Sequence, residues 1–221
     1  MTEDRRASAP ARYGLLLITL IAAYLVSAVT YTRWGGTIHV AFVTAVALLA
    51  LRHTRPWPTG AWLAAVLGVA SAVAAGVAAV SANQTAQAAS DVWSAVVLLL
   101  SVVVIVDRVL RLERVTAQSI YGALSAYLLI GLMFAAWYAA ISGLVSGPFF
   151  VNSEPANAET LQYFSFTTLT TLGYGDFTAA GSLGRALAVL EAIAGQVFLA
   201  TLVARLVSAY GTSRRQRPPG E

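Results

Sequence analysis

The amino-acid sequence predicts an all-α membrane protein with six transmembrane helices and one short re-entrant helix and loop between the fifth and the sixth. Three observations predict this class. Hydrophobic residues make up 58% of the 221 residues, against roughly 45 to 50% in soluble domains. Charged residues make up only 11%, against roughly 25%. Six apolar stretches approach the roughly 20 residues that a helix needs to cross a bilayer.

The same composition excludes several classes of function. The chain has no cysteine, which excludes disulfide frameworks, thiolate metal sites and cysteine nucleophiles. Only two histidines, His39 and His53, are present. No catalytic nucleophile, general base or metal-binding cluster is evident, so we expect that the protein is not an enzyme and needs no cofactor. The net charge of +4 lies between hydrophobic runs rather than on one polar face, so nucleic acid is not an expected partner.

The expected helices follow a polar N-terminal segment, residues 1–12, and cover 13–31, 38–51, 61–80, 92–112, 119–142 and 183–209. The first lacks the short core and cleavage site of a signal peptide, so we interpret it as a retained helix. The second is the shortest, and a start at Trp34 would let it reach across. The third carries Gly68, Ala72 and Gly76 at four-residue spacing, a stripe on which another helix can approach closely.

Arginine placement predicts the orientation of these helices. Short cytoplasmic loops hold an excess of positive charge. Arginines precede the first helix and follow the second, fourth and sixth, whereas only Arg33 and Arg185 fall on the other side. We therefore expect a multi-pass protein of the cell membrane with both termini in the cytoplasm. Every basic residue is arginine and alanine is abundant, which is typical of a GC-rich, prokaryotic source.

The segment between the fifth and sixth helices differs from the others. A polar loop over 142–158 precedes the apolar stretch 159–169, whose length as a helix is only about 16 Å. A helix of that length cannot span the bilayer. Followed by glycines, it predicts a re-entrant loop, which is tolerated only where protein or a water-filled cavity surrounds its backbone.

The residues after this short helix read Thr170-Thr171-Leu172-Gly173-Tyr174-Gly175-Asp176. They resemble the selectivity filter of potassium channels, with leucine in place of the usual valine. Backbone carbonyls can replace the water of a potassium ion if successive carbonyls face one way. Glycine reaches the positive φ angles that this needs without steric cost.

The resemblance implies a role for each filter residue. The carbonyls of Thr171, Leu172, Gly173 and Tyr174, with the Thr171 hydroxyl, would bind K⁺, and Gly175 would complete the filter. Tyr174 would pack against aromatics such as Tyr163 and Phe164. Asp176 would face the outer mouth and raise the local cation concentration.

One chain holds one filter copy, so the resemblance implies a homotetramer in the lipid bilayer. It also divides the chain into a four-helix region, 13–114, similar to a voltage-sensor domain, a pore domain over 115–210 and a cytoplasmic tail over 211–221. The front region lacks a sensing arginine array, because Arg108, Arg111 and Arg114 lie only at the inner end of the fourth helix. We therefore expect passive potassium conduction without steep voltage gating.

Three residues of the sixth helix are candidates for gating or structural roles. Gly195 fits either a hinge or a close-packing position, and Gln196 is expected to line the cavity. Glu191 is an intramembrane acid. It is expected either to bond a hydroxyl of the short helix, such as Thr167 or Thr168, or to sense protons or ions. Some potassium channels carry an acid at this place in the short helix, and that acid braces the filter aspartate. Here the place is taken by these threonines, so the sequence does not predict which residue braces Asp176.

Two other functions stay open at this point. A non-selective cation channel would have the same architecture. A secondary transporter with a re-entrant loop is a further alternative, although transporters usually show paired broken helices in inverted halves, and only one interrupted segment occurs here.

Overall fold

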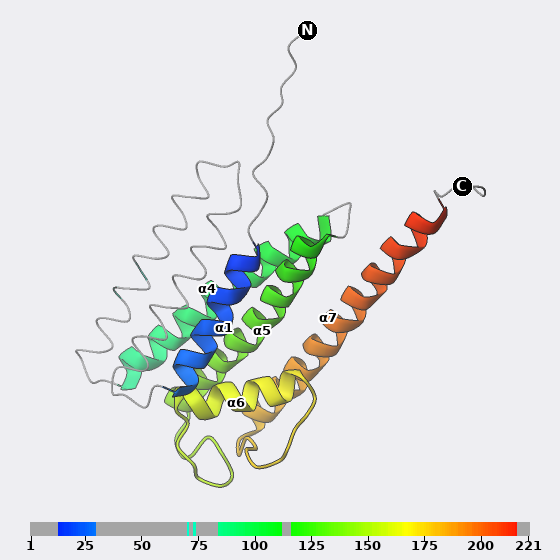
Figure 1. Cartoon of the computed structure of the whole chain (residues 1–221). Coiled ribbons are helices and arrows are strands. Elements are labelled where there is room, and N and C mark those ends of the chain that lie inside the picture. Colours follow the sequence, from blue (N-terminus) through cyan, green and yellow to red (C-terminus); the bar gives the residue numbers. More distant parts are fainter. Residues whose placement is uncertain (1–12, 30–69, 71–72, 74–83, 112–115, 216–221) are drawn as a thin grey trace.

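The computed structural model describes residues 13–29, 70, 73, 84–111 and 116–215. Its helices are α1 (Tyr13–Val29), α4 (Gln84–Arg111), α5 (Ala117–Leu144), α6 (Ala158–Leu169) and α7 (Ser182–Arg215) (Figure 1). In this part of the chain the all-helical class is confirmed. The helices predicted over 38–51 and 61–80 lie outside the described residues, apart from two positions in the second of them.

Three of these helices contain spans long and apolar enough to cross a membrane. The spans are Gln87–Asp107, Ala117–Leu144 and Ser182–Ser208, and α1 contributes a shorter apolar run, Tyr13–Ala22. Helix α4 begins eight residues before the predicted start, since its first two turns are polar and escape a search for apolar residues. Helix α7 likewise continues to Arg215, beyond the predicted end.

Helix α5 is the centre of the described fold. Helices α1 and α4 pack on it, and α6 and α7 also contact it. Figure 1 shows α6 lying across the end of α5, and α7 leaving from that same end. The shared core contains the fully buried side chains of Leu20, Leu98, Ile105, Leu129 and Tyr138.

Helix α6 has strong local start signals. The Asn157 side chain accepts a hydrogen bond from the Thr160 amide at 2.9 Å, and the Thr160 hydroxyl accepts from the Asn157 amide at 3.1 Å. This capping box satisfies two amides at the helix start. Glu159 in the first turn complements the positive end of the helix dipole. With 12 residues, α6 is about 18 Å long, which is too short to cross the roughly 30 Å hydrocarbon core of a bilayer.

Helix α7 is apolar yet hardly covered by the rest of the chain. Only 11% of its most apolar stretch is buried within the chain, against 67% for the corresponding stretch of α5. Several of its large apolar side chains are more than half exposed, namely Leu183, Val189, Leu190, Ile193, Val197, Val203 and Val207. Such a surface needs lipid or another protein surface against it.

Candidate functional site

The segment Thr170–Asp176 leaves the C-terminal end of α6, and each of its residues is exposed in the single chain. The amides of Leu172 and Gly173 both donate to the Thr167 carbonyl, at 2.8 and 3.1 Å. In a trans peptide the carbonyl points away from the following amide N–H. The carbonyls of Thr171 and Leu172 therefore point away from α6, toward the exposed side of the segment.

Every second residue of this segment has a positive φ. The angles are 58° at Thr171, 50° at Gly173 and 84° at Gly175. Glycine adopts this region freely, whereas a β-branched residue such as threonine rarely does. An alternation of positive and negative φ can keep successive carbonyls on one side of the chain. A Cβ built on either glycine would meet no atom within 4 Å, so backbone conformation, rather than crowding within the chain, calls for glycine.

The far end of the segment is held by hydrogen bonds to both the short helix and the preceding loop. The Tyr163 hydroxyl donates to Asp176 Oδ2 at 2.9 Å, and the Asn152 side-chain amide donates to the Asp176 carbonyl at 2.9 Å. The hydrogen bond with Asp176 raises the pKa of Tyr163, so the phenol stays a donor above its ordinary titration range. Asp176 is thus braced from α6, by a phenol rather than by an acid.

The ring of Tyr174 stacks on the ring of Tyr163, with centroids 6.4 Å apart and an angle of 10° between the planes. This contact agrees with the prediction for Tyr174. Phe164, the other aromatic named for that role, packs instead among Tyr138, Phe149 and Phe150. The reason is helical geometry, because adjacent residues of α6 point about 100° apart and cannot both face the same ring.

The loop between α5 and α6 pairs with the chain that follows Asp176. Phe150 and Ala179 form an antiparallel bridge, and the Ala180 amide donates to the Phe149 carbonyl at 2.8 Å. The Arg185 side chain of α7 donates to the Ala179 carbonyl at 2.8 Å. These bonds connect the chain after the Thr170–Asp176 segment to the loop between α5 and α6 and to α7.

The other end of the segment contacts α7. Gln196 Nε2 lies 3.2 Å from Thr171 Oγ1, and that hydroxyl donates to the Thr170 carbonyl at 2.7 Å. The structure therefore brings two predicted site residues, Thr171 and Gln196, together where α7 meets the segment.

Gly195 lies against the end of α6. A Cβ built on it would collide with the Leu169 carbonyl oxygen and would come within 3.0 Å of Leu169 Cδ1. The close-packing role expected for Gly195 has a definite partner here, and the hinge role stays a prediction.

Glu191 is completely buried, one turn before Gly195 on α7. Its Oε1 lies 2.5 Å from Ser165 Oγ, and its Oε2 accepts from the Tyr138 hydroxyl at 2.6 Å. The expected hydroxyl partner on the short helix is present, but the choice of Thr167 or Thr168 was wrong. Gly195 of α7 packs on Leu169 of α6. One turn earlier on both helices, Glu191 therefore meets Ser165.

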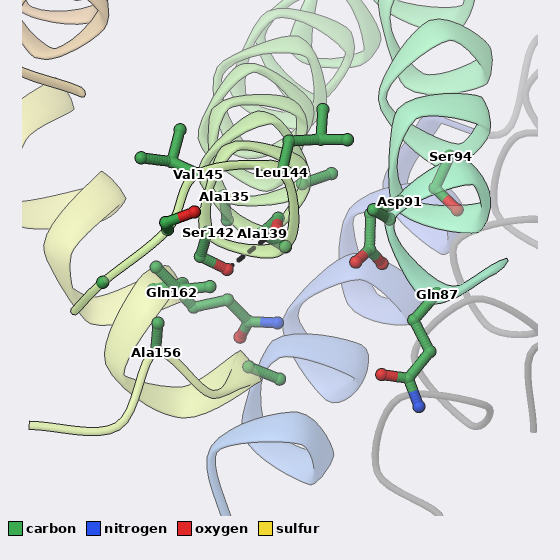
Figure 2. Close-up of a pocket in the computed structure, with 17 residues that line it drawn as sticks. Gln87, Asp91, Ser94, Ala135, Ala139, Ser142, Leu144, Val145, Ala156 and Gln162 are labelled. Atoms are coloured by element: carbon green, nitrogen blue, oxygen red, sulfur yellow. Dashed lines mark hydrogen bonds between the residues drawn. The ribbon is translucent and has the colours of Figure 1, made fainter. Parts of the chain in front are cut away.

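A separate cavity of about 520 Å³ lies between the first turns of α4, the end of α5 and the start of α6 (Figure 2). Asp91 and Ser94 of α4, Ser142 of α5 and Gln162 of α6 contribute its polar lining. Among the described residues no three His, Asp or Glu side chains gather as metal ligands. We therefore assign no ion site to this cavity.

Sequence reasoning missed several side chains that hold the candidate site. Tyr138, Asn152 and Ser165 carried no local signal, since each contacts a residue 24 or more positions away. Tyr163 was noted as a packing partner only. The segment Thr170–Asp176 and its residue types were identified from the sequence motif alone.

A family model described as "Ion channel" matches residues 138–211. The match begins in α5 and covers α6, the segment Thr170–Asp176 and most of α7. No curated protein matches the chain. The family match supports passive conduction of ions through a membrane, and ion channels are not a class of enzyme.

Proposed function

We propose that this chain is one subunit of a homotetrameric, potassium-selective channel that conducts K⁺ passively across the cell membrane. The observation that carries the proposal is the alternation of positive φ at Thr171, Gly173 and Gly175. Together with the amides of Leu172 and Gly173, which face the Thr167 carbonyl, it gives a row of carbonyls on one exposed side. The residue types of the potassium-channel motif support potassium as the ion.

The mechanism follows from the chemistry of dehydration. A cation enters a narrow filter only if protein oxygens replace its water, and stacked rings of carbonyls do so for K⁺. The carbonyls of Thr171, Leu172, Gly173 and Tyr174, with the Thr171 hydroxyl, form these rings in the proposal. The bonds to Thr167, Asp176 and Gln196 hold the carbonyl row in place, so the rings stay wide enough for K⁺.

A single chain supplies only one wall of such a ring. The segment is exposed on the side where the carbonyls point, and α7 has an uncovered apolar surface beside it. Four copies around an axis would complete the carbonyl rings and cover part of α7. The C-terminal, partly negative ends of the four α6 helices would then point toward the cavity and favour a cation there.

The family match, the three apolar spans and the arginine distribution support the rest of the proposal. The protein crosses the membrane several times, with the filter toward the outside and the termini inside. Potassium ions and lipid are then its partners. The front helices act as a structural support for the pore.

A flux assay with an independent mass measurement tests the proposal. Protein in lipid nanodiscs should show a mass of four subunits. Vesicles that contain the protein should release K⁺ down its gradient and retain Na⁺. Release of both ions at equal rates would make the protein a non-selective cation channel, and transport of K⁺ only with a coupled substrate would contradict the channel function itself.

A further inference from the structure

Three helices meet at one fully buried carboxyl group. Glu191 of α7 has no exposed surface, and its two partners in the described structure are hydroxyls from the two neighbouring helices. The Tyr138 hydroxyl of α5 lies 2.6 Å from Oε2, and Ser165 Oγ of α6 lies 2.5 Å from Oε1. Both distances are those of hydrogen bonds, so a proton lies between each pair of oxygens.

Ser165 makes a second contact. Its Oγ also lies 2.7 Å from the carbonyl oxygen of Gly131 on α5. This approach depends on glycine, because a Cβ at position 131 would stand 2.7 Å from the Phe166 ring, the next residue of α6. The serine hydroxyl thus faces two oxygens, one of Glu191 and one of Gly131.

A count of protons decides the ionisation state of Glu191. A serine hydroxyl has one proton to donate, and a backbone carbonyl and an ionised carboxylate have none. If Glu191 were ionised, Ser165 could bond either Glu191 or Gly131, and the remaining pair of oxygens would repel each other. If Glu191 carries a proton, Tyr138 donates to Glu191, Glu191 donates to Ser165, and Ser165 donates to Gly131.

The burial of Glu191 also favours the protonated carboxyl group. A charged carboxylate buried among apolar helices is costly unless a cation pairs with it. The partners of Glu191 are neutral hydroxyls. In the part of the chain that the structure describes, Tyr138 and Tyr127 of α5 are the titratable groups that interact electrostatically with it, and neither carries a positive charge in any state.

We propose that Glu191 is protonated in the folded protein and is a positioning residue, a neutral hydrogen-bond donor to Ser165 that fixes α6 between α5 and α7. The chain of bonds runs from Tyr138 through Glu191 and Ser165 to Gly131. The protonation itself does not depend on the proposed channel function.

The consequence for conduction does rest on that function. Ser165 lies one turn before Leu169, whose carbonyl packs against Gly195 and accepts from the Tyr127 hydroxyl at 3.2 Å. Thr167 lies between them on α6, and its carbonyl accepts hydrogen bonds from the amides of Leu172 and Gly173. A shift of α6 on loss of the Ser165 bonds would therefore move the filter carbonyls.

Infrared spectroscopy of the full-length protein in lipid at neutral pH tests the protonation. A protonated carboxyl has a C=O stretch separate from that of a carboxylate. The parent should show such a band that is missing from Glu191→Gln, whereas the control Glu154→Gln, which changes an exposed loop acid, should leave it in place. A Glu191→Gln spectrum that loses a carboxylate band instead would overturn the proposal.

A set of variants tests the positioning role. Glutamine at 191 can donate to Ser165 and accept from Tyr138, so Glu191→Gln should keep the thermal stability and potassium flux of the parent. Glu191→Leu and Ser165→Ala each break the chain of bonds and should lower both. If Glu191→Gln lowered the thermal stability and the potassium flux as much as Glu191→Leu, the neutral-donor role would be wrong. If the parent instead failed to discriminate K⁺ from Na⁺, the proposed function would fail while the infrared result stood.

Discussion

The hydroxyl of Tyr163, on the short helix α6, donates a hydrogen bond to the carboxylate of Asp176, directly after the proposed filter, at 2.9 Å. The two residues are 13 positions apart, with the whole Thr170–Gly175 stretch between them. The bond therefore closes a loop around the proposed filter and fixes the Asp176 end of that segment relative to α6.

Replacing Tyr163 with phenylalanine should remove this brace while keeping the ring that stacks on Tyr174. We expect a current that remains potassium-selective but decays faster during sustained opening. Single-channel recording of reconstituted protein measures this. Tyr121→Phe, which removes a partly exposed phenol of α5 away from the filter, is the matched control. Equal decay in parent and Tyr163→Phe would show that the bond does not stabilise the filter.

The pH dependence of the same brace follows from the raised pKa of Tyr163. The neutral phenol is the donor, so the brace is fully present below the ordinary tyrosine pKa of about 10. It is lost only as the pH rises through the higher pKa in the folded protein. Sustained current should therefore withstand moderate alkali in the parent, and Tyr163→Phe should show no loss linked to this group. A steep change of the decay rate near neutral pH that occurs in the parent and is absent from Tyr163→Phe would contradict the assignment.

Substitution of Gly195 with alanine should destabilise the packing of α7 on α6, because the added Cβ would collide with the Leu169 carbonyl. Overpacking of this kind typically costs about 1 to 3 kcal/mol. Thermal unfolding in detergent measures the effect, with Gly181→Ala as the control, since a Cβ there meets nothing within 4 Å. Unchanged stability combined with an altered open probability would favour the hinge role instead.

The conductance of the parent should depend only weakly on voltage. Each elementary charge that crosses the field contributes about 2.3 kcal/mol per 100 mV, so steep gating needs several arginines within the membrane. Residues 92–106 of α4 contain none, and Arg108 and Arg111 come in its last turn. A conductance–voltage curve in symmetric potassium checks this, with Arg108→Gln and Arg111→Gln beside the parent. A steep parent curve that flattens in the variants would show that these arginines sense voltage.

Sequence reasoning predicted what depends on local pattern. Hydropathy and length identified the three described helices that are long and apolar enough to cross a membrane, and the shortness of the stretch 159–169 predicted a re-entrant segment. Two features were beyond its reach. The positive φ of Thr171 could not be predicted, because the residue is not a glycine. It accompanies the hydrogen bonds of the Leu172 and Gly173 amides to the Thr167 carbonyl. The Glu191 partners come from two other helices, at separations of 26 and 53 residues, which no local pattern encodes.

Alanine at Gly173 or Gly175 should abolish potassium selectivity or current. A residue with a Cβ in the left-handed region costs roughly 1 to 2 kcal/mol, and relief of that strain would turn carbonyls away from the ion path. Gly147→Ala is the matched control, because Gly147 also has a positive φ and open space around it but lies in the loop after α5. Bi-ionic recordings of the three variants separate strain at the filter from strain elsewhere. Retained selectivity in both filter variants would contradict this assignment of the ion sites.

The central claim, potassium selectivity, is tested most directly by the reversal potential of the purified protein in a planar lipid bilayer with K⁺ on one side and Na⁺ on the other. The proposal predicts a reversal potential displaced far toward the potassium equilibrium potential, and one that follows each change of the potassium gradient. A reversal potential near zero that ignores the potassium gradient would contradict it.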